Sequence, residues 1–282
     1  MKFFLILFFG FCIQVLACQF NYVVKDSLNF PEKSGFLNLS LQKFGDSLRE
    51  HRTNKFIIYC KIGSFADSNI SILKNDTETA ISRVKKILNI QNLPNAFYVI
   101  VVDSRDEMKN FVGIRHKGMT SLENDLIFLV YNQNTRAYIR HELFHLVAFR
   151  LWGRPSNRIL DEGGAMYADS ICLDYNNPII VLNKYLYDNN QWFPFQDLKV
   201  NFNKCAREND MIAYLQSAII FKYLYENYGL DKIEDLWKNG FVKFSEFYGF
   251  DYDDLKDRLT KLILNADSEN VDWNELMQKG CG

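Results

Sequence analysis

The sequence predicts an α+β fold, in which a small mixed α/β lobe at residues 55–132 is followed by a mostly helical lobe at residues 133–282. In the first stretch, short runs of aliphatic and aromatic residues alternate with segments of helical apolar spacing. In the second, apolar residues recur chiefly at helical spacing. The chain has 282 residues, 48% of them hydrophobic, which is enough for one large domain or two small ones.

Residues 1–17 are interpreted as a signal peptide. Lys2 supplies a short positive region, and the apolar run at residues 3–11 is too short to span a bilayer. The sequence Val-Leu-Ala-Cys at residues 15–18 resembles a bacterial lipobox, in which the cysteine is lipidated and becomes the new N-terminus. Cys18 is therefore the expected lipid attachment, and the alternative is plain secretion.

The number of cysteines agrees with export to an oxidising compartment. If Cys18 carries lipid, the cysteines that remain after cleavage are even in number, which suits two disulfides in three alternative pairings. They are Cys60, Cys172, Cys205 and Cys281. If Cys18 keeps a free side chain, one cysteine is left over, and reduced buried cysteines are also common. We expect an exported lipoprotein of the bacterial cell envelope, held to the membrane by its N-terminal lipid.

Residues 18–54 are predicted to be an irregular tether with one short helix at residues 39–49, because this stretch is polar and lacks sustained periodicity. The α/β lobe follows. Its expected elements are strand 55–62, helix 77–89, strand 97–102, helix 103–112 and strand 125–132. The second strand is apolar enough to be central in a sheet, and residues 113–123 are predicted to be a loop.

A helix predicted at residues 135–152 contains the pattern H-E-x-x-H. Residues four apart on a helix share a face, so His141 and His145 can offer two imidazoles to one metal ion. Glu142 is expected beside them, near a water molecule on that metal. This pattern is the signature of zinc hydrolases in which the glutamate is the general base. The alternative is a solvated or buried histidine pair without a metal.

Catalytic zinc usually has three protein ligands, so the pattern needs one more. Glu162 can supply it from a second helix, predicted at about residues 156–172. Gly153 and Pro155 are helix-stop signals that allow the chain to turn and bring the second helix antiparallel to the first. The two glycines at 163–164 would either allow close approach of the helix backbones or form a flexible turn.

H-E-x-x-H followed by L-x-E-G-x-A-x-Y resembles the gluzincin zinc metallopeptidases, in particular peptidase-MA-like proteins and, more distantly, aminopeptidase N. The specific part covers residues 140–167. The resemblance implies one zinc ion per chain, held by His141, His145 and Glu162, with Glu142 as catalytic base. It also implies a zincin-like fold with the active-site cleft between the two lobes.

The resemblance carries further expectations. In this family, an edge strand of the small lobe binds extended substrate. Residues 126–131 are the candidate for that strand here, and the alternative is that they form an ordinary core strand. Tyr214 matches a tyrosine that donates to the developing oxyanion. Leu-Glu-Asn at residues 122–124 partly resembles the segment with which aminopeptidases hold a free N-terminus. Independently of the resemblance, Asp161 lies beside Glu162 and Asp169 lies two helical turns further on. Either can accept a hydrogen bond from a ligand histidine, the alternative for each being a surface residue.

These features predict an exported zinc-dependent metallopeptidase that acts on a peptide or protein substrate. A zinc-activated water would attack the peptide bond, with Glu142 as general base and Tyr214 stabilising the oxyanion. The alternative is a non-catalytic zinc-containing surface-binding lipoprotein or envelope factor that retains the peptidase fold. The net charge of −1 does not indicate nucleic-acid binding.

Overall fold

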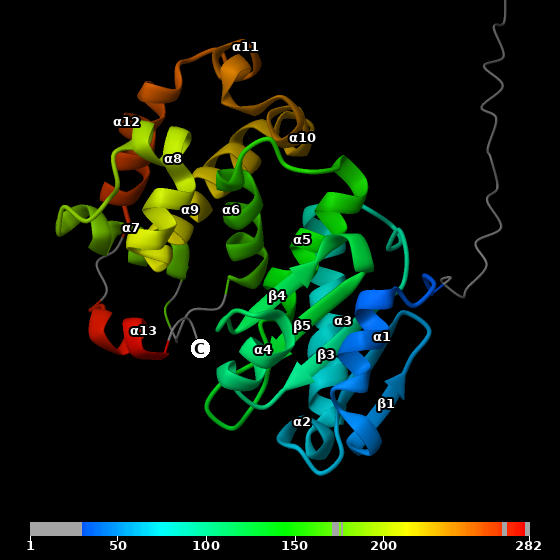
Figure 1. The fold of residues 1–282 in the computed structure, drawn as a ribbon. Coiled ribbons are helices and arrows are strands. Elements are labelled where there is room, and N and C mark those ends of the chain that lie inside the picture. Colours follow the sequence, from blue (N-terminus) through cyan, green and yellow to red (C-terminus); the bar gives the residue numbers. More distant parts are fainter. Residues whose placement is uncertain (1–29, 171–174, 176, 267–269, 280–282) are drawn as a thin grey trace, which may run out of the picture.

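The structure is a computed structural model that describes residues 30–170, 175, 177–266 and 270–279. The expected signal peptide at residues 1–17 and the candidate lipidation site Cys18 lie outside the described residues, as do Cys172 and Cys281. Figure 1 shows a sheet with its flanking helices in one half of the molecule and a group of helices in the other half.

A five-stranded mixed sheet forms the centre of the small lobe within the described residues, in the order β1-β2-β3-β5-β4. Its strands are β1 (Leu48–Arg52), β2 (Phe56–Lys61), β3 (Phe97–Val102), β4 (Gly118–Ser121) and β5 (Leu126–Val130). The inner strands β2, β3 and β5 are parallel to one another. The antiparallel strands β1 and β4 form the two edges of the sheet.

Helices cover both faces of the sheet, as Figure 1 shows. They are α1 (Gly35–Gln42) and α4 (Arg105–Val112) on one face, and α3 (Ile70–Ile87) and α5 (Ile139–Trp152) on the other, with the short α2 (Phe65–Ser68) before α3. Every residue of β3 is buried, and the neighbouring Val99 and Ile100 belong to cores on opposite faces. A strand covered on both faces is apolar throughout, which explains why β3 is predictable as a central strand.

Two expectations about the end of the small lobe are wrong. Residues 113–123, expected to be a loop, contain β4, whose Gly-Met-Thr-Ser sequence has no alternating apolar pattern. The proposed substrate-binding edge strand at residues 126–131 is an inner strand, because β5 pairs with β3 on one side and β4 on the other. The edge beside α5 is therefore β4.

The expected irregular tether also contains regular structure. Residues 35–52 form α1, a short 3-10 helix η1 (Gly45–Ser47) and β1, which pairs with β2. Ser34 caps α1 by accepting a 3.1 Å hydrogen bond from the Leu37 N–H, so the helix begins earlier than residue 39. Leu37 is fully buried against the sheet, and this segment is thus an integral part of the small lobe.

The helical lobe is built around α9 (Asp210–Tyr228), which contacts α6, α7, α8 and α10. Its other helices are α6 (Arg158–Asp169), α7 (Pro178–Asp188), α8 (Phe195–Glu208), α10 (Leu230–Asn239), α11 (Phe244–Tyr248), α12 (Tyr252–Leu264) and α13 (Trp273–Lys279), with the 3-10 helix η3 (Gly240–Lys243) after α10. In the small lobe, a 3-10 helix η2 (Leu122–Asn124) connects β4 to β5. The predicted α+β class, with a small mixed lobe followed by a mostly helical lobe, is confirmed. Among the helices described, none is long and apolar enough to cross a membrane.

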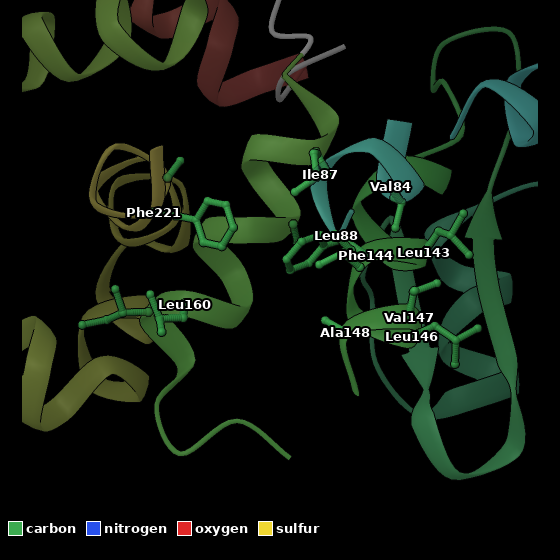
Figure 2. Close-up of a cluster of buried hydrophobic side chains, with 14 of the residues drawn as sticks. Val84, Ile87, Leu88, Leu143, Phe144, Leu146, Val147, Ala148, Leu160 and Phe221 are labelled. Carbon is green, nitrogen blue, oxygen red and sulfur yellow. The ribbon is translucent and has the colours of Figure 1, made fainter. Parts of the chain in front are cut away.

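Helices α5, α6 and α9 approach one another closely at two glycines of α6. A Cβ atom at Gly163 would lie 2.3 Å from the carbonyl oxygen of Ser217 in α9, and one at Gly164 would lie 2.3 Å from the ring of Phe144 in α5. Phe144 meets Phe221 edge-on, with ring centroids 5.7 Å apart, at the junction drawn in Figure 2. Both glycines are therefore needed for close helix packing and do not form a flexible turn.

Cys60 in β2 and Cys205 in α8 are free and buried. The predicted pair of disulfides requires both of them, so that prediction is wrong. Both side chains belong to the apolar core, where a reduced cysteine packs like a small hydrophobic residue.

Candidate active site

Helix α5 positions the first three candidate residues. Buried apolar side chains surround most of its circumference, and it ends at Gly153, whose φ of 79° suits glycine. His141 and His145 lie one helical turn apart, and their Nε2 atoms are 3.1 Å from each other. The structure therefore brings the two imidazoles to one point.

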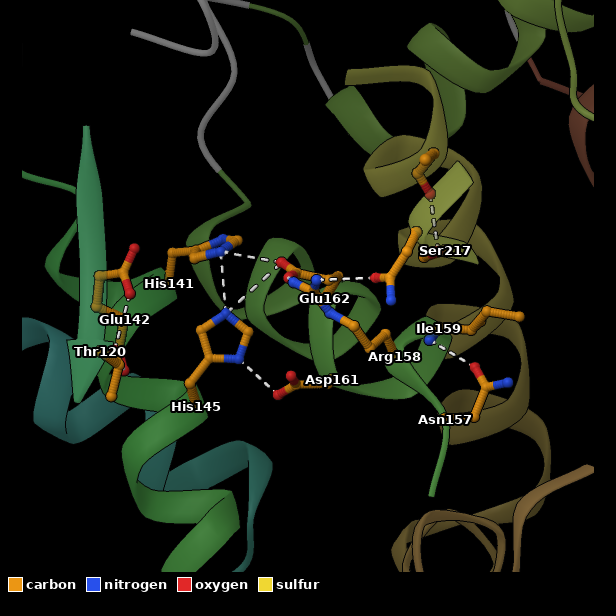
Figure 3. Close-up of polar contacts among 12 residues, drawn as sticks. Thr120, His141, Glu142, His145, Asn157, Arg158, Ile159, Asp161, Glu162 and Ser217 are labelled. Carbon is orange, nitrogen blue, oxygen red and sulfur yellow. Dashed lines mark hydrogen bonds and ion pairs between the residues drawn. The ribbon is translucent and has the colours of Figure 1, made fainter. Parts of the chain in front are cut away.

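Helix α6 brings Glu162 to the same point, as Figure 3 shows. Asn157 caps this helix by accepting a 2.7 Å hydrogen bond from the Ile159 N–H. Glu162 Oε2 lies 3.4 Å from His141 Nε2 and 3.6 Å from His145 Nε2. Zinc bonds of about 2.0–2.1 Å in a tetrahedral arrangement place ligand atoms about 3.3 Å apart. The three atoms thus have separations that fit a tetrahedral zinc ion.

The two candidate partners of a ligand histidine have different roles. Asp161 Oδ1 lies 2.5 Å from His145 Nδ1, in hydrogen-bond contact. Such a carboxylate holds the imidazole in the tautomer that leaves Nε2 available to a metal. Asp169 instead accepts a 3.0 Å hydrogen bond from Arg136, so it does not contact the histidines in this way.

Glu162 is a buried carboxylate, only 3% exposed. Burial alone would raise the pKa of Glu162, but hydrogen bonds from His141 and His145 lower this pKa well below its usual range. The side chain is therefore anionic, which is the state that binds a cation. Its second oxygen, Oε1, accepts a hydrogen bond from Arg158 one turn earlier in α6. This contact leaves Oε2 directed toward the two imidazoles.

Glu142 lies outside the group formed by the three candidate ligands. Thr120 of β4 donates a 2.8 Å hydrogen bond to Glu142 Oε2, and Figure 3 shows this contact on the far side of His141 from Glu162. A Cβ atom at Gly118 would lie 2.4 Å from Glu142 Oε1, so any side chain there would displace the Glu142 carboxylate. A carboxylate fixed beside the ligands, but not among them, is suited to accept a proton.

Tyr214 of α9 borders the same group. Its ring is stacked near His141, with centroids 6.3 Å apart, and on Phe202, with centroids 6.1 Å apart. Burial, followed by the negative charge of Glu162, raises the pKa of Tyr214 well above its usual value. The hydroxyl therefore keeps its proton at neutral pH and can donate a hydrogen bond.

A cavity of about 510 Å³ lies over these side chains. One wall comes from α4, the loop after it and β4, and the other comes from α5, α6 and α9. This volume is within the range of roughly 300–1,000 Å³ that is usual for ligand pockets. The expected cleft between the two lobes is thus present.

Glu123 does not take the place of an amine-binding glutamate. It forms an ion pair with Arg154 in which both side chains are more than 60% exposed. Leu122 borders the cavity, but Glu123 is not among the described residues that line it. The partial resemblance of residues 122–124 to an aminopeptidase segment therefore has no support in the geometry.

A second group of metal-type side chains, His51, Cys60 and Asp67, lies near β1 and β2. Arg49 donates to both carboxylate oxygens of Asp67, at 3.1 and 2.9 Å, and the Gly63 N–H donates to one of them at 2.9 Å. Burial, followed by the charge of Asp67, raises the pKa of Cys60 to about 11, which disfavours the thiolate. The group on α5 and α6 is therefore the better metal site.

A family model described as the Peptidase MA superfamily matches residues 125–265. The chain is similar to two solved structures. Yeast LTA4 hydrolase in complex with bestatin is 18% identical, with a TM-score of 0.38, and native leukotriene A4 hydrolase from Saccharomyces cerevisiae is 15% identical, with a TM-score of 0.37. These similarities cover 81% and 83% of this chain but only 38% and 39% of those chains. No curated protein matches the sequence.

Proposed function

The chain belongs to the Peptidase MA superfamily, and from this membership and the site geometry we propose that it is a zinc-dependent metallopeptidase of gluzincin type. Its substrate is a peptide or protein. His141, His145 and Glu162 would hold one zinc ion, which when bound lowers the pKa of a water molecule and polarises the scissile carbonyl group.

The remaining roles belong to side chains of the protein itself. Glu142 accepts a proton from the attacking water and passes it to the leaving amine. Thr120 and Gly118 keep the Glu142 carboxylate in place for this transfer. Tyr214 donates a hydrogen bond to the carbonyl oxygen as that oxygen gains negative charge.

One observation carries this proposal: Glu142 is held by β4 and lies apart from the three candidate ligands. A structural zinc ion is usually enclosed by four protein ligands and has no use for a separate base. In the described part of the chain, the group on α5 and α6 offers three ligands, which leaves a position for water. The arrangement thus favours catalysis over a non-catalytic metal-containing binding protein.

The test is digestion of a mixed peptide library by the purified, zinc-loaded protein, followed by mass spectrometry. We expect cleavage that a chelator abolishes and that added zinc restores. A protein that holds one zinc ion per chain but cuts no peptide in the library would instead support the non-catalytic surface-binding lipoprotein.

Replacing Tyr214 by Phe removes only the hydroxyl group. We expect Tyr214→Phe to retain zinc and to lose ~10²–10³-fold in kcat, as is usual when one oxyanion donor is removed. Tyr225→Phe is the matched control, because Tyr225 lies on the same helix and packs against Phe221. Equal kcat values for Tyr214→Phe and wild type would exclude the oxyanion role.

We further propose that the protein is exported and anchored by lipid on Cys18, with simple secretion as the alternative. Cys18→Ser should move the protein from the detergent phase to the aqueous phase in a partition experiment. One acyl chain binds membranes only marginally, so a stable anchor requires the full modification with several chains. Cys12→Ser, in the same leader, is the control. A Cys18→Ser protein that partitions like wild type would rule out this anchor.

A further inference from the structure

The two walls of the cavity differ in charge. The small-lobe wall contains four basic side chains, and no described carboxylate lines that wall. These basic residues are Arg105, Arg115, His116 and Lys117. The helical wall contains the carboxylates of Glu142, Asp161, Glu162 and Asp210, and Arg158, the one arginine among its described residues, is paired with Glu162. Three of these four already have a place in the candidate metal site, as base, histidine partner or ligand.

The basic residues continue directly from the strand that holds the candidate base. Gly118 and Thr120 of β4 contact Glu142. The carbonyl oxygen of Lys117 accepts a 2.8 Å hydrogen bond from the Val130 N–H, so the pairing with β5 extends one residue before β4. Strand residues are about 3.3 Å apart, which places residues 115–117 within roughly 10 Å of Gly118 along the chain.

An extended peptide bound along β4 would therefore pass the basic residues. β4 is an edge of the sheet, and edge strands accept peptides by main-chain pairing. Antiparallel pairing is slightly more stable per residue than parallel pairing. With the scissile carbonyl group beside Glu142, an antiparallel peptide places the residues that follow the scissile bond next to residues 115–117.

From this geometry we propose that the small-lobe wall is a carboxylate-binding subsite for the part of the substrate on the C-terminal side of the scissile bond. The ligand is an acidic side chain or the C-terminal carboxylate of the peptide. This inference rests on the proposed peptidase function. Lysine and arginine donate charge-assisted hydrogen bonds to carboxylates, and arginine does so with two parallel bonds.

The basic residues differ in their surroundings. Arg115 pairs with Asp106 at an exposed position, where such a pair is weak, so it contributes mainly to the long-range field. Arg105 begins α4 and is exposed at the cavity. Burial, followed by the charges of Arg105 and Arg136, lowers the pKa of Lys117 to about 8. A substrate carboxylate would favour the charged form of Lys117 and is thus suited to this position.

Binding provides the first test and does not depend on turnover. The probes are fluorescent peptides of one sequence with paired Glu or paired Gln residues near the C-terminus, each as free acid and as amide. Their anisotropy is measured with the zinc-loaded Glu142→Gln protein. We expect at least roughly tenfold tighter binding of the Glu peptides at low salt, and a smaller difference at high salt. If the Glu and Gln free acids bind equally, and each binds more tightly than its amide by this factor, the ligand is the terminal carboxylate.

Matched variants locate the subsite. Arg105→Gln combined with Lys117→Gln should bring the ratio of Glu to Gln affinities close to one. Lys109→Gln, in the same helix but outside the described cavity lining, should leave that ratio unchanged. Circular dichroism and zinc content of each variant confirm that the fold and the metal site are retained.

Cleavage of the same peptides by wild type shows which side of the scissile bond carries the preference. Equal affinities for Glu and Gln peptides, with no effect of amidation, would overturn the subsite, and so would an acidic preference confined to the N-terminal side. If wild type cuts no peptide, but acidic peptides still bind more tightly and lose this advantage in the Arg105→Gln, Lys117→Gln variant, the subsite stands and the peptidase function fails.

Discussion

Glu142→Gln should keep its zinc and lose ~10²–10⁴-fold in kcat/KM for peptide hydrolysis, the usual contribution of a general base. Glutamine has nearly the same shape as glutamate, so it should fit the space left by Gly118 and still meet Thr120. It cannot accept the proton of the attacking water. The measurement is the initial rate of chelator-sensitive cleavage, together with zinc content per chain.

Glu123→Gln is the control for this variant. Glu123 follows β4, the strand that contacts Glu142, but it pairs with Arg154 at an exposed position. Its rate should match wild type. Two results would contradict the assignment of Glu142. Cleavage by Glu142→Gln at the wild-type rate would mean that this carboxylate is not the base. Loss of zinc from the variant would mean that the carboxylate is part of the ligand set.

The parts of the site that lie on α5 and α6 are predictable from local sequence. His141, Glu142 and His145 share one short helix, so their relative positions follow from helical spacing alone. Glu162 and its neighbouring glycines lie on the next helix, and Gly153 marks the turn between the two. Because α5 is apolar around most of its circumference, its signal is the i, i+4 spacing of the two histidines and not an apolar period.

The β4 side of the site was not predictable in the same way. Gly118 and Thr120 contact Glu142 only because β4 pairs with β5 and packs beside α5. A strand of four partly exposed residues has no clear period, so the sequence favours a loop there. The contact of Arg158 with Glu162 has helical i, i+4 spacing, which could have indicated it.

The cysteines illustrate a different limit. An even number of cysteines in an exported chain favours disulfides, but parity says nothing about distance. Cys60 lies in the central sheet and Cys205 lies in α8, each within apolar packing. Only the tertiary arrangement shows that both thiols are free and buried.

The second large effect is expected at the metal. Glu162→Ala should lower zinc affinity by more than ~100-fold, since even the loss of a residue that only orients a ligand costs ~10–100-fold. Asp161→Asn is that milder case, because Asp161 contacts His145 and is not a ligand itself. Competition with a chelating dye gives the dissociation constants of both variants and wild type.

The order of these affinities tests the assignment of the third ligand. Glu162→Ala removes the oxygen that lies 3.4 and 3.6 Å from the two Nε2 atoms, whereas Asp161→Asn leaves this arrangement in place. Arg158, half exposed at the rim, can turn to solvent when Glu162 is lost, so the variant should still fold. Glu162→Ala protein that is folded by circular dichroism and binds zinc as tightly as wild type would show that the third ligand is another residue.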